Sequence, residues 1–225
     1  MREKNNIPHC LCHPPWRSNV NKIPQPKIAL VAGASGIIGR ELVKTLLRNR
    51  WEVIGLSRHA SSHPENIPFI HVDLLDAQHS AQKLHSLNGV THIFYSAWAN
   101  AGNWAEMVEP NVTMLRNLVS NIEQTAPLRT VSLMQGYKVY GAHLGPFKTP
   151  ARESDPGAPG AEFNAAQLTW LSHFQRGKTW RWNAIRPGTA TMSTRVAMKL
   201  SDSVQCQGSS FQLRKTMKSG SSGLP

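Results

Sequence analysis

Three glycines at a fixed spacing are the first residues of this sequence that could do chemistry. Gly33, Gly36 and Gly39 follow the pattern G-x-x-G-x-x-G directly after the apolar run 28–32. The first glycine lets the chain turn sharply out of a strand, and the second lets backbone N–H groups approach a pyrophosphate. The third lets the following helix lie close to the strand. The pattern predicts a dinucleotide-binding turn, with an ordinary tight turn as the alternative.

The residues after the glycines favour the nucleotide site over the ordinary turn. Apolar residues recur at helical spacing at Ile38, Leu42, Val43, Leu46 and Leu47, so we expect this segment to be a helix packed on a sheet. A second apolar run ends at Leu56. It completes the strand–helix–strand unit that the glycine motif requires.

The end of the second predicted strand indicates which dinucleotide is bound. An acidic residue there would hold the ribose 2′-OH of NAD, whereas an arginine suits the 2′-phosphate of NADP. The sequence has Ser57 and Arg58 at that place and no acid before Glu65. It therefore favours NADP(H) as the cofactor.

Further strand and helix patterns extend this unit into a larger sheet. Apolar runs predict strands at 67–72, 91–96, 128–134 and 180–185, with helices at 77–87, 108–122 and 162–176 and a long Pro- and Gly-rich loop at 141–161. Alternating strands and helices are typical of an α/β fold, here a Rossmann-type doubly wound parallel sheet of strand order 3-2-1-4-5-6. Ligands bind at the carboxyl ends of such strands.

Charge is concentrated at the two ends of the chain. Of the formal charge of +12 over 225 residues, residues 1–27 and 189–225 each contribute five Lys or Arg against one acid. We therefore predict an NADP-binding domain at 27–188, a disordered basic leader at 1–26 and a disordered basic tail at 189–225. No basic stripe carries interleaved aromatic residues, so nucleic-acid binding is not expected.

The cysteines and the hydropathy argue against a disulfide-rich, metal-binding, membrane or secreted protein. Cys10, Cys12 and Cys206 are odd in number and show no second ligand cluster, so neither a disulfide framework nor a metal site is expected. No apolar run approaches the roughly 20 residues of a membrane span. The first residues lack the apolar core of a secretory signal. We expect a cytoplasmic protein that does not enter the membrane.

Several short motifs in one order resemble the extended or atypical short-chain dehydrogenase/reductases. The glycine turn is followed by Ser57-Arg58, Asp73-Leu74, Phe94-Tyr95-x-x-Trp98 and Lys138. This order is similar to that of the progesterone 5β-reductase/iridoid synthase-like group, from about Lys27 to Gly188. The resemblance implies NADPH-dependent reduction of the carbon–carbon double bond of an enone, or of a carbonyl, in a small molecule.

The resemblance also implies site residues, position by position. The implied cofactor-binding residues are Gly33, Ser35, Gly36, Ile37, Ile38, Gly39, Ser57, Arg58, Asp73, Leu74, Ala97, Trp98, Met134, Arg186 and Pro187. The implied catalytic residues are Lys138, which would stabilise negative charge on the substrate oxygen or orient the nicotinamide ribose, and Tyr140, which could donate a proton. Packing beneath the Pro-rich loop is an equal explanation for Tyr140. Asp73 could instead cap a helix, although Asp76 suits that role better.

Two departures from the family pattern leave the activity open. The family places its active tyrosine at the start of the helix before the sixth strand, where this sequence has Asn164 and Ala165. The resemblance also ends at Gly188, so we expect the substrate domain to be largely missing and the uncovered apolar surface to favour self-association. A non-catalytic NADP-binding sensor or inactive reductase, and a nucleotide-sugar epimerase or dehydratase, are the alternative functions.

Overall fold

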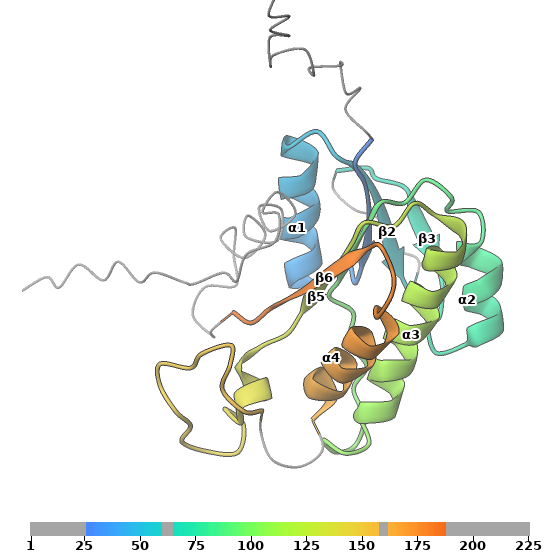
Figure 1. The fold of residues 1–225 in the computed structure, drawn as a ribbon. Coiled ribbons are helices and arrows are strands. Elements are labelled where there is room, and N and C mark those ends of the chain that lie inside the picture. Colours follow the sequence, from blue (N-terminus) through green and yellow to red (C-terminus); the bar gives the residue numbers. More distant parts are fainter. Residues whose placement is uncertain (1–25, 60–64, 158–161, 188–225) are drawn as a thin grey trace, which may run out of the picture.

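The computed structural model describes residues 26–59, 65–157 and 162–187 (Figure 1). The elements in chain order are β1 (Ile28–Ala32), α1 (Ile37–Arg48), β2 (Glu52–Ser57), β3 (Phe69–His71), α2 (Ala77–Leu84), β4 (His92–Tyr95), α3 (Val108–Thr125), β5 (Thr130–Met134), the 3₁₀ helix η1 (Tyr137–Tyr140), α4 (Phe163–Phe174) and β6 (Arg181–Ile185). The predicted tail, the leader up to residue 25 and the three cysteines lie outside the described residues.

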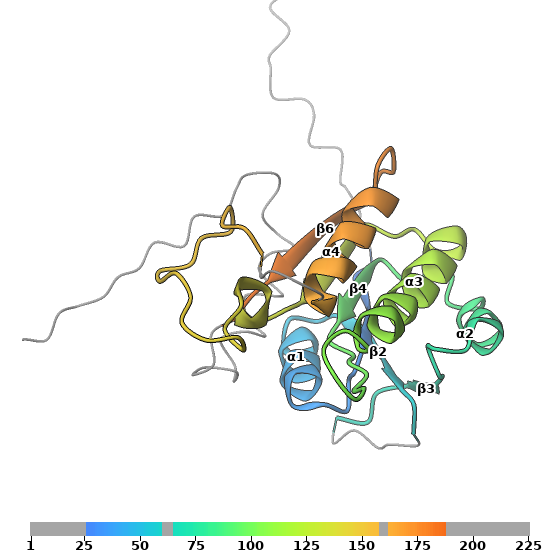
Figure 2. The ribbon, with the colours of Figure 1, turned by 90° about the horizontal axis from the view of Figure 1, so that it is seen from below.

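The six strands form one parallel sheet in the order β3-β2-β1-β4-β5-β6. This order confirms the predicted Rossmann-type doubly wound fold. Figure 2 shows α1 on one face of the sheet and α2, α3 and α4 on the other. The strand order changes direction between β1 and β4, which is where sheets of this kind bind ligands beyond the strand carboxyl ends.

Strand β3 is shorter than its apolar run predicts. The sequence indicates a strand over 67–72, whereas only Phe69–His71 is a strand, paired with Gly55, Leu56 and Ser57 of β2. Pro68 has no N–H group to donate to the ladder, which limits the pairing on that side. The helix predicted at 77–87 is also shorter, since α2 ends at Leu84.

Strand β1 lies at the centre of the core. Leu30 and Ala32 are fully buried toward α2, α3 and α4, while Ala29 and Val31 are fully buried toward α1. Alternate residues of one strand thus face two apolar layers, as expected for a parallel strand covered on both sides. The carboxyl end of β1 is therefore held rigidly where the glycine turn begins.

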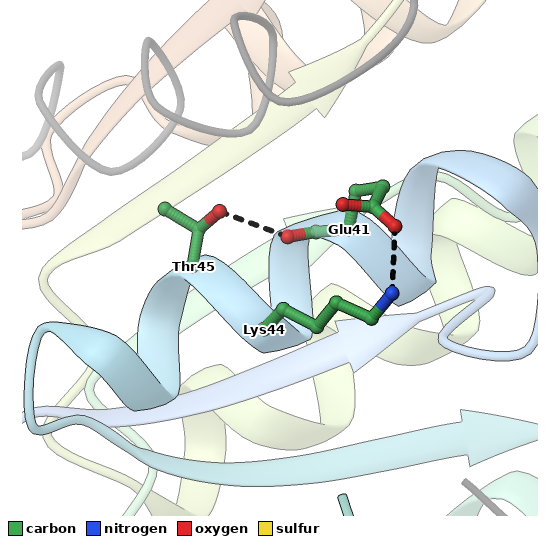
Figure 3. Close-up of polar contacts among 3 residues, drawn as sticks. All are labelled: Glu41, Lys44 and Thr45. Carbon is green, nitrogen blue, oxygen red and sulfur yellow. Dashed lines mark hydrogen bonds and ion pairs between the residues drawn. The ribbon is translucent and has the colours of Figure 1, made fainter. Parts of the chain in front are cut away.

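Polar contacts among three residues of α1, two of them partly exposed and one buried, are shown in Figure 3. Lys44 Nζ lies 2.9 Å from Glu41 Oε1, and Thr45 Oγ1 donates a hydrogen bond of 2.9 Å to the Glu41 carbonyl. The hydrogen bond from Lys44 lowers the pKa of the Glu41 carboxyl. A partly exposed ion pair of this kind adds little to stability, so α1 is held mainly by its buried apolar face.

One titratable side chain is buried in the core beside α1. His92 of β4 is 4% exposed, its Nδ1 lies 2.8 Å from Thr91 Oγ1, and its ring meets the edge of Trp51 at 4.7 Å between centroids. Burial lowers the pKa of His92 to about 4, and the nearby cations of Arg129 and Lys27 act in the same direction.

The buried His92 predicts a fold that loses stability in acid. Its folded-state pKa of about 4 is below the usual 6.5, so above that usual value the group is neutral in both states. As the pH falls below 6.5, only the unfolded chain takes up the proton, which costs roughly 2 to 3 kcal/mol of stability by pH 4.5. Urea unfolding at pH 7 and 4.5 measures this loss.

His92→Phe keeps a ring against Trp51 and removes the titration. Its loss of stability between the two pH values should be smaller than that of the wild type by the same roughly 2 to 3 kcal/mol. Carboxyl groups that titrate in this range affect both proteins alike. An equal loss in the two proteins would contradict the prediction.

Candidate functional site

Two of the three motif glycines are required by close backbone contacts. Gly33 has a φ of +81°, and a β-carbon there would lie 2.9 Å from the carbonyl carbon of Ser96. A β-carbon on Gly39 would lie 2.1 Å from the Gly33 carbonyl oxygen. Gly36 has an ordinary φ of −76°, and its nearest such contact is 3.3 Å. The first and third glycines are therefore required by the fold, while a β-carbon at the second would make a tight but less severe contact with the Gly33 carbonyl oxygen.

The amino end of α1 is free of side-chain capping. Gly36 is the N-cap residue and offers no side-chain hydrogen bond to the first turn. Ile37, the first helical residue, is 81% exposed. The uncapped N–H groups and the positive end of the helix dipole suit a phosphate group.

A cleft of about 340 Å³ opens beside this turn at the carboxyl ends of β1, β2 and β4. Its walls are formed by Gly33, Ser35, Gly36, Leu56, Ser57, Arg58, His59, Val72, Leu74, Ser96, Ala97, Trp98 and Met114. Just over half of the predicted cofactor residues are thus brought together. The lining contains no carboxylate, and Arg58 is an exposed cation at its edge.

The other predicted cofactor residues lie outside the lining of this cleft. They are Ile37, Ile38, Gly39, Asp73, Met134, Arg186 and Pro187. Met134 packs against the apolar layer under α1. Asp73 Oδ1 accepts a local hydrogen bond from the Leu75 N–H at 3.0 Å. Asp76 caps α2 by accepting from the His79 N–H at 2.9 Å, which confirms it as the better cap candidate.

A second cleft, of about 370 Å³, lies at the opposite edge of the sheet. It is lined by residues that precede β5 and β6, among them Leu128 and Trp180, and by the ion pair of Glu123 with Lys178 at 3.1 Å. None of the predicted site residues lines it. Since parallel sheets bind ligands at the carboxyl edge, the cleft at the glycine turn is the better candidate despite its slightly smaller volume.

The loop after β4 is held in place by Asn111, a residue that the sequence motifs do not indicate. The Asn111 side chain accepts from the Ala99 N–H at 2.9 Å and donates to the Ala99 and Met107 carbonyls at 2.8 Å. Gln167 of α4 donates to the Asn111 carbonyl at 2.8 Å. These bonds set the path of the loop that carries Trp98, which is 51% exposed at the cleft.

The two predicted catalytic residues share η1, and neither lines the cleft. Lys138 is exposed, and its ammonium lies 4.2 Å from the centroid of the Trp104 ring. The centroid of the His143 ring lies 4.5 Å from that of Trp104. The Tyr140 hydroxyl accepts a hydrogen bond of 2.7 Å from Arg186 Nη1. Both side chains thus lie beyond the carboxyl ends of β5 and β6.

Within the described residues, no three His, Cys, Asp or Glu side chains are grouped so that they could hold a metal ion. None of the helices described is both long and apolar enough to cross a membrane.

The parallel sheet, the glycine turn and the cleft at its carboxyl edge define a Rossmann-type nucleotide-binding protein. Residues 29–176 match the NAD dependent epimerase/dehydratase family, and the chain belongs to this family. The match confirms the predicted relationship to the short-chain dehydrogenase/reductases.

Two relatives show the level of similarity. A short chain dehydrogenase of Penicillium aethiopicum is 33% identical over 175 residues, covering 72% of this chain and 46% of the relative. The 3-oxo-Delta(4,5)-steroid 5-beta-reductase of Arabidopsis thaliana is 38% identical over 131 residues, covering 53% of this chain and 32% of that enzyme. The chain therefore spans less than half the length of these relatives.

Solved structures share the fold at lower identity. The UDP-glucose 4-epimerase of Thermus thermophilus, solved in complex with NAD, superposes with a TM-score of 0.57 at 23% identity over 71% of this chain and 54% of the other. The Brucella ovis UDP-glucose 4-epimerase, also in complex with NAD, gives 0.59 at 19% identity over 71% and 51% of the two chains.

The contacts of the glycines predict different effects for two alanine substitutions. Gly39→Ala should lower the free energy of unfolding by about 1 to 3 kcal/mol, since its β-carbon collides with the Gly33 carbonyl. Gly36→Ala should cost less than about 1 kcal/mol but weaken dinucleotide binding, since its methyl group enters the space beside the turn. Urea unfolding and fluorescence titration with NADPH measure the two effects. Equal destabilisation by both substitutions would refute the distinction.

Proposed function

We propose that residues 27–188 form an NADP(H)-binding unit that reduces an enone or a carbonyl of a small molecule. The observation that carries the cofactor assignment is the cleft itself, which has Arg58 at its edge and no carboxylate in its lining. A carboxylate at the end of β2 would repel a 2′-phosphate, whereas a guanidinium binds it through charge-assisted hydrogen bonds. The similarity to an enzyme named as a 5-beta-reductase supports reduction.

The residues of the cleft fit the parts of such a cofactor. The turn at Gly33 and Gly36 and the free amino end of α1 would hold the pyrophosphate. Arg58 would hold the 2′-phosphate, with Ser57 fixing the loop because its hydroxyl accepts from the His59 N–H at 3.2 Å. Apolar Leu74 would contact the adenine. The bound cofactor supplies hydride from C4 of its nicotinamide.

The chain's own residues would manage the charge that hydride transfer creates. As the substrate oxygen becomes negative, a nearby ammonium or hydroxyl lowers the energy of that charge. Lys138 offers the ammonium and Tyr140 the hydroxyl, both from η1 after β5. The carboxyl ends of β4, β5 and β6 form the half of the edge where we place the nicotinamide and the substrate.

A non-catalytic NADP-binding protein is the second candidate function. At the start of α4, where the related enzymes have a tyrosine, Asn164 Nδ2 donates to the buried Glu162 carboxylate at 2.6 Å, so no hydroxyl is offered there. Binding of NADPH without turnover of any substrate would favour this second function.

The open edge of β6 supports the expected tendency to self-associate. This strand is the last of the sheet in the described residues and pairs only with β5. Unpaired N–H and C=O groups at such an edge can accept a further strand.

The cofactor assignment predicts tighter binding of NADPH than of NADH. Arg58→Ala should weaken NADPH binding by about tenfold or more, because a charge-assisted contact is lost, and leave NADH binding within about twofold. Arg48→Ala, at the exposed end of α1, is the control and should change neither affinity. Fluorescence titration of the three proteins measures this, and tighter NADH binding by the wild type would overturn the assignment.

The reductase assignment predicts that Lys138→Ala slows NADPH oxidation with small enones or aldehydes by about 100-fold, since charge stabilisation at the substrate oxygen is lost. The NADPH dissociation constant should stay within about twofold. Lys44→Ala removes a lysine from the outer face of α1 and should retain full activity. An unchanged rate in Lys138→Ala would exclude this lysine from the reaction.

A further inference from the structure

A series of hydrogen bonds joins the start of α4 to η1 at the carboxyl edge of the sheet. Glu162 Oε1 accepts from Asn164 Nδ2 at 2.6 Å, and the Asn164 carbonyl accepts from Gln135 Nε2 at 2.6 Å. Gln135 Oε1 then accepts from Arg186 Nε at 3.0 Å, and Arg186 Nη1 donates to the Tyr140 hydroxyl at 2.7 Å. Four separate elements of the chain thus meet in one network.

Burial makes this network rigid. Glu162 is 3% exposed, while Gln135 and Asn164 are each 5% exposed. Glu162 also caps α4 by accepting from the Ala165 N–H at 2.9 Å. Because a backbone carbonyl can only accept, the amide nitrogen of Gln135 must face Asn164 and its oxygen must face Arg186. The direction of the guanidinium is therefore determined by buried groups.

The network also determines the role of the Tyr140 hydroxyl. Arg186 has only donors, so the phenolic oxygen is an acceptor in this bond and its own proton remains available. In the part of the chain that the structure describes, that proton has no hydrogen-bond acceptor and the Arg186 guanidinium has no carboxylate within ion-pair distance. An uncompensated cation thus lies against the oxygen that would become negative.

We propose that Arg186 is a positioning residue that presents Tyr140 as the proton donor, and that η1 thereby supplies the acid that the start of α4 lacks. The inference rests on the proposed reductase function and reassigns Arg186 from a cofactor ligand to a partner of Tyr140. Asn164, which stands in the region of the family's tyrosine, contributes its carbonyl to the network instead of a hydroxyl.

In the proposed step, NADPH supplies the hydride and Tyr140 supplies the proton. The β-carbon of the enone would receive hydride from C4 of NADPH, which is thereby oxidised to NADP⁺. The electron pair of the carbon–carbon double bond would shift through the conjugated system to the carbonyl oxygen, which becomes negative. The proton of the Tyr140 hydroxyl passes to that oxygen and gives an enol, which becomes the saturated ketone. The resulting phenolate stays bonded to Arg186 and regains a proton from water.

Steady-state kinetics at saturating NADPH test the pair. Tyr140→Phe and Arg186→Met should each lower kcat by about 100-fold, and the double variant should be no slower than either, because the first removes the proton donor and the second removes the residue that positions that same donor. KM and the NADPH dissociation constant should stay within about twofold. Arg186→Lys should recover part of kcat. Tyr137→Phe on η1 and Arg181→Met on β6 are the controls and should keep the wild-type rate.

Several outcomes would overturn the inference. If the two single effects multiply in the double variant, the residues act separately. If Arg186→Met raises KM or weakens NADPH binding with kcat unchanged, Arg186 holds a ligand. If Arg186→Lys is no better than Arg186→Met while both bind NADPH normally, the cation does not act through Tyr140.

A spectroscopic measurement separates failure of this inference from failure of the proposed function. The chain has three tyrosines, so ¹³Cζ-tyrosine labelling gives a simple spectrum in which Tyr140→Phe identifies the Tyr140 resonance. Arg186→Met should shift that resonance and leave that of Tyr95 in place. A wild type that binds NADPH but turns nothing over contradicts the reductase, and the shift then still decides whether Arg186 holds Tyr140. An unmoved resonance overturns the pairing.

Discussion

The contact between the start of α1 and the turn after β1 is the constraint on which the cleft depends. A β-carbon at Gly39 would lie 2.1 Å from the Gly33 carbonyl oxygen, so the helix can approach the strand this closely only without one. Gly33 in turn lies against the backbone of Ser96 after β4. One turn therefore brings the loops after β1 and β4 together, while the pairing of β1 with β2 adds the loop of Arg58.

The two halves of the carboxyl edge of the sheet differ in the kind of residues that form them. The half at β1 and β2 is an open cleft defined by glycines and by one exposed arginine. The half at β5 and β6 is a network of buried amides and one buried carboxylate that ends on Arg186 and Tyr140. Buried polar groups of this kind must be paired to be tolerated, and the pairing makes the second half rigid. Binding and chemistry would thus be divided between the two halves.

The match to the NAD dependent epimerase/dehydratase family covers residues 29–176, which include the glycine turn, Tyr140 and α4 and end before β6 and Arg186. The proteins that resemble this chain in sequence or in fold differ in their named activities, a 5-beta-reductase and UDP-glucose 4-epimerases among them. A shared fold does not determine the reaction.

The sequence by itself determined the strand order, the position of the nucleotide turn and the main apolar layers. These features depend on local patterns: the apolar run of β1, the spacing of Gly33, Gly36 and Gly39, and the helical period of α1. Such patterns can be recognised in the sequence because residues on one face of a strand or helix recur at a fixed spacing. The length of β3 was less predictable, since it depends on how many residues of β2 find partners.

Only the tertiary structure decided how the polar side chains combine. Asn111 and Gln167 are 56 positions apart in the chain, and Tyr140 and Arg186 are 46 apart. A single asparagine or arginine forms no repeating pattern in the sequence, so its distant hydrogen-bond partner cannot be predicted from the sequence. These long-range bonds form because folding buries polar groups that must then find partners at whatever sequence distance the sheet brings near.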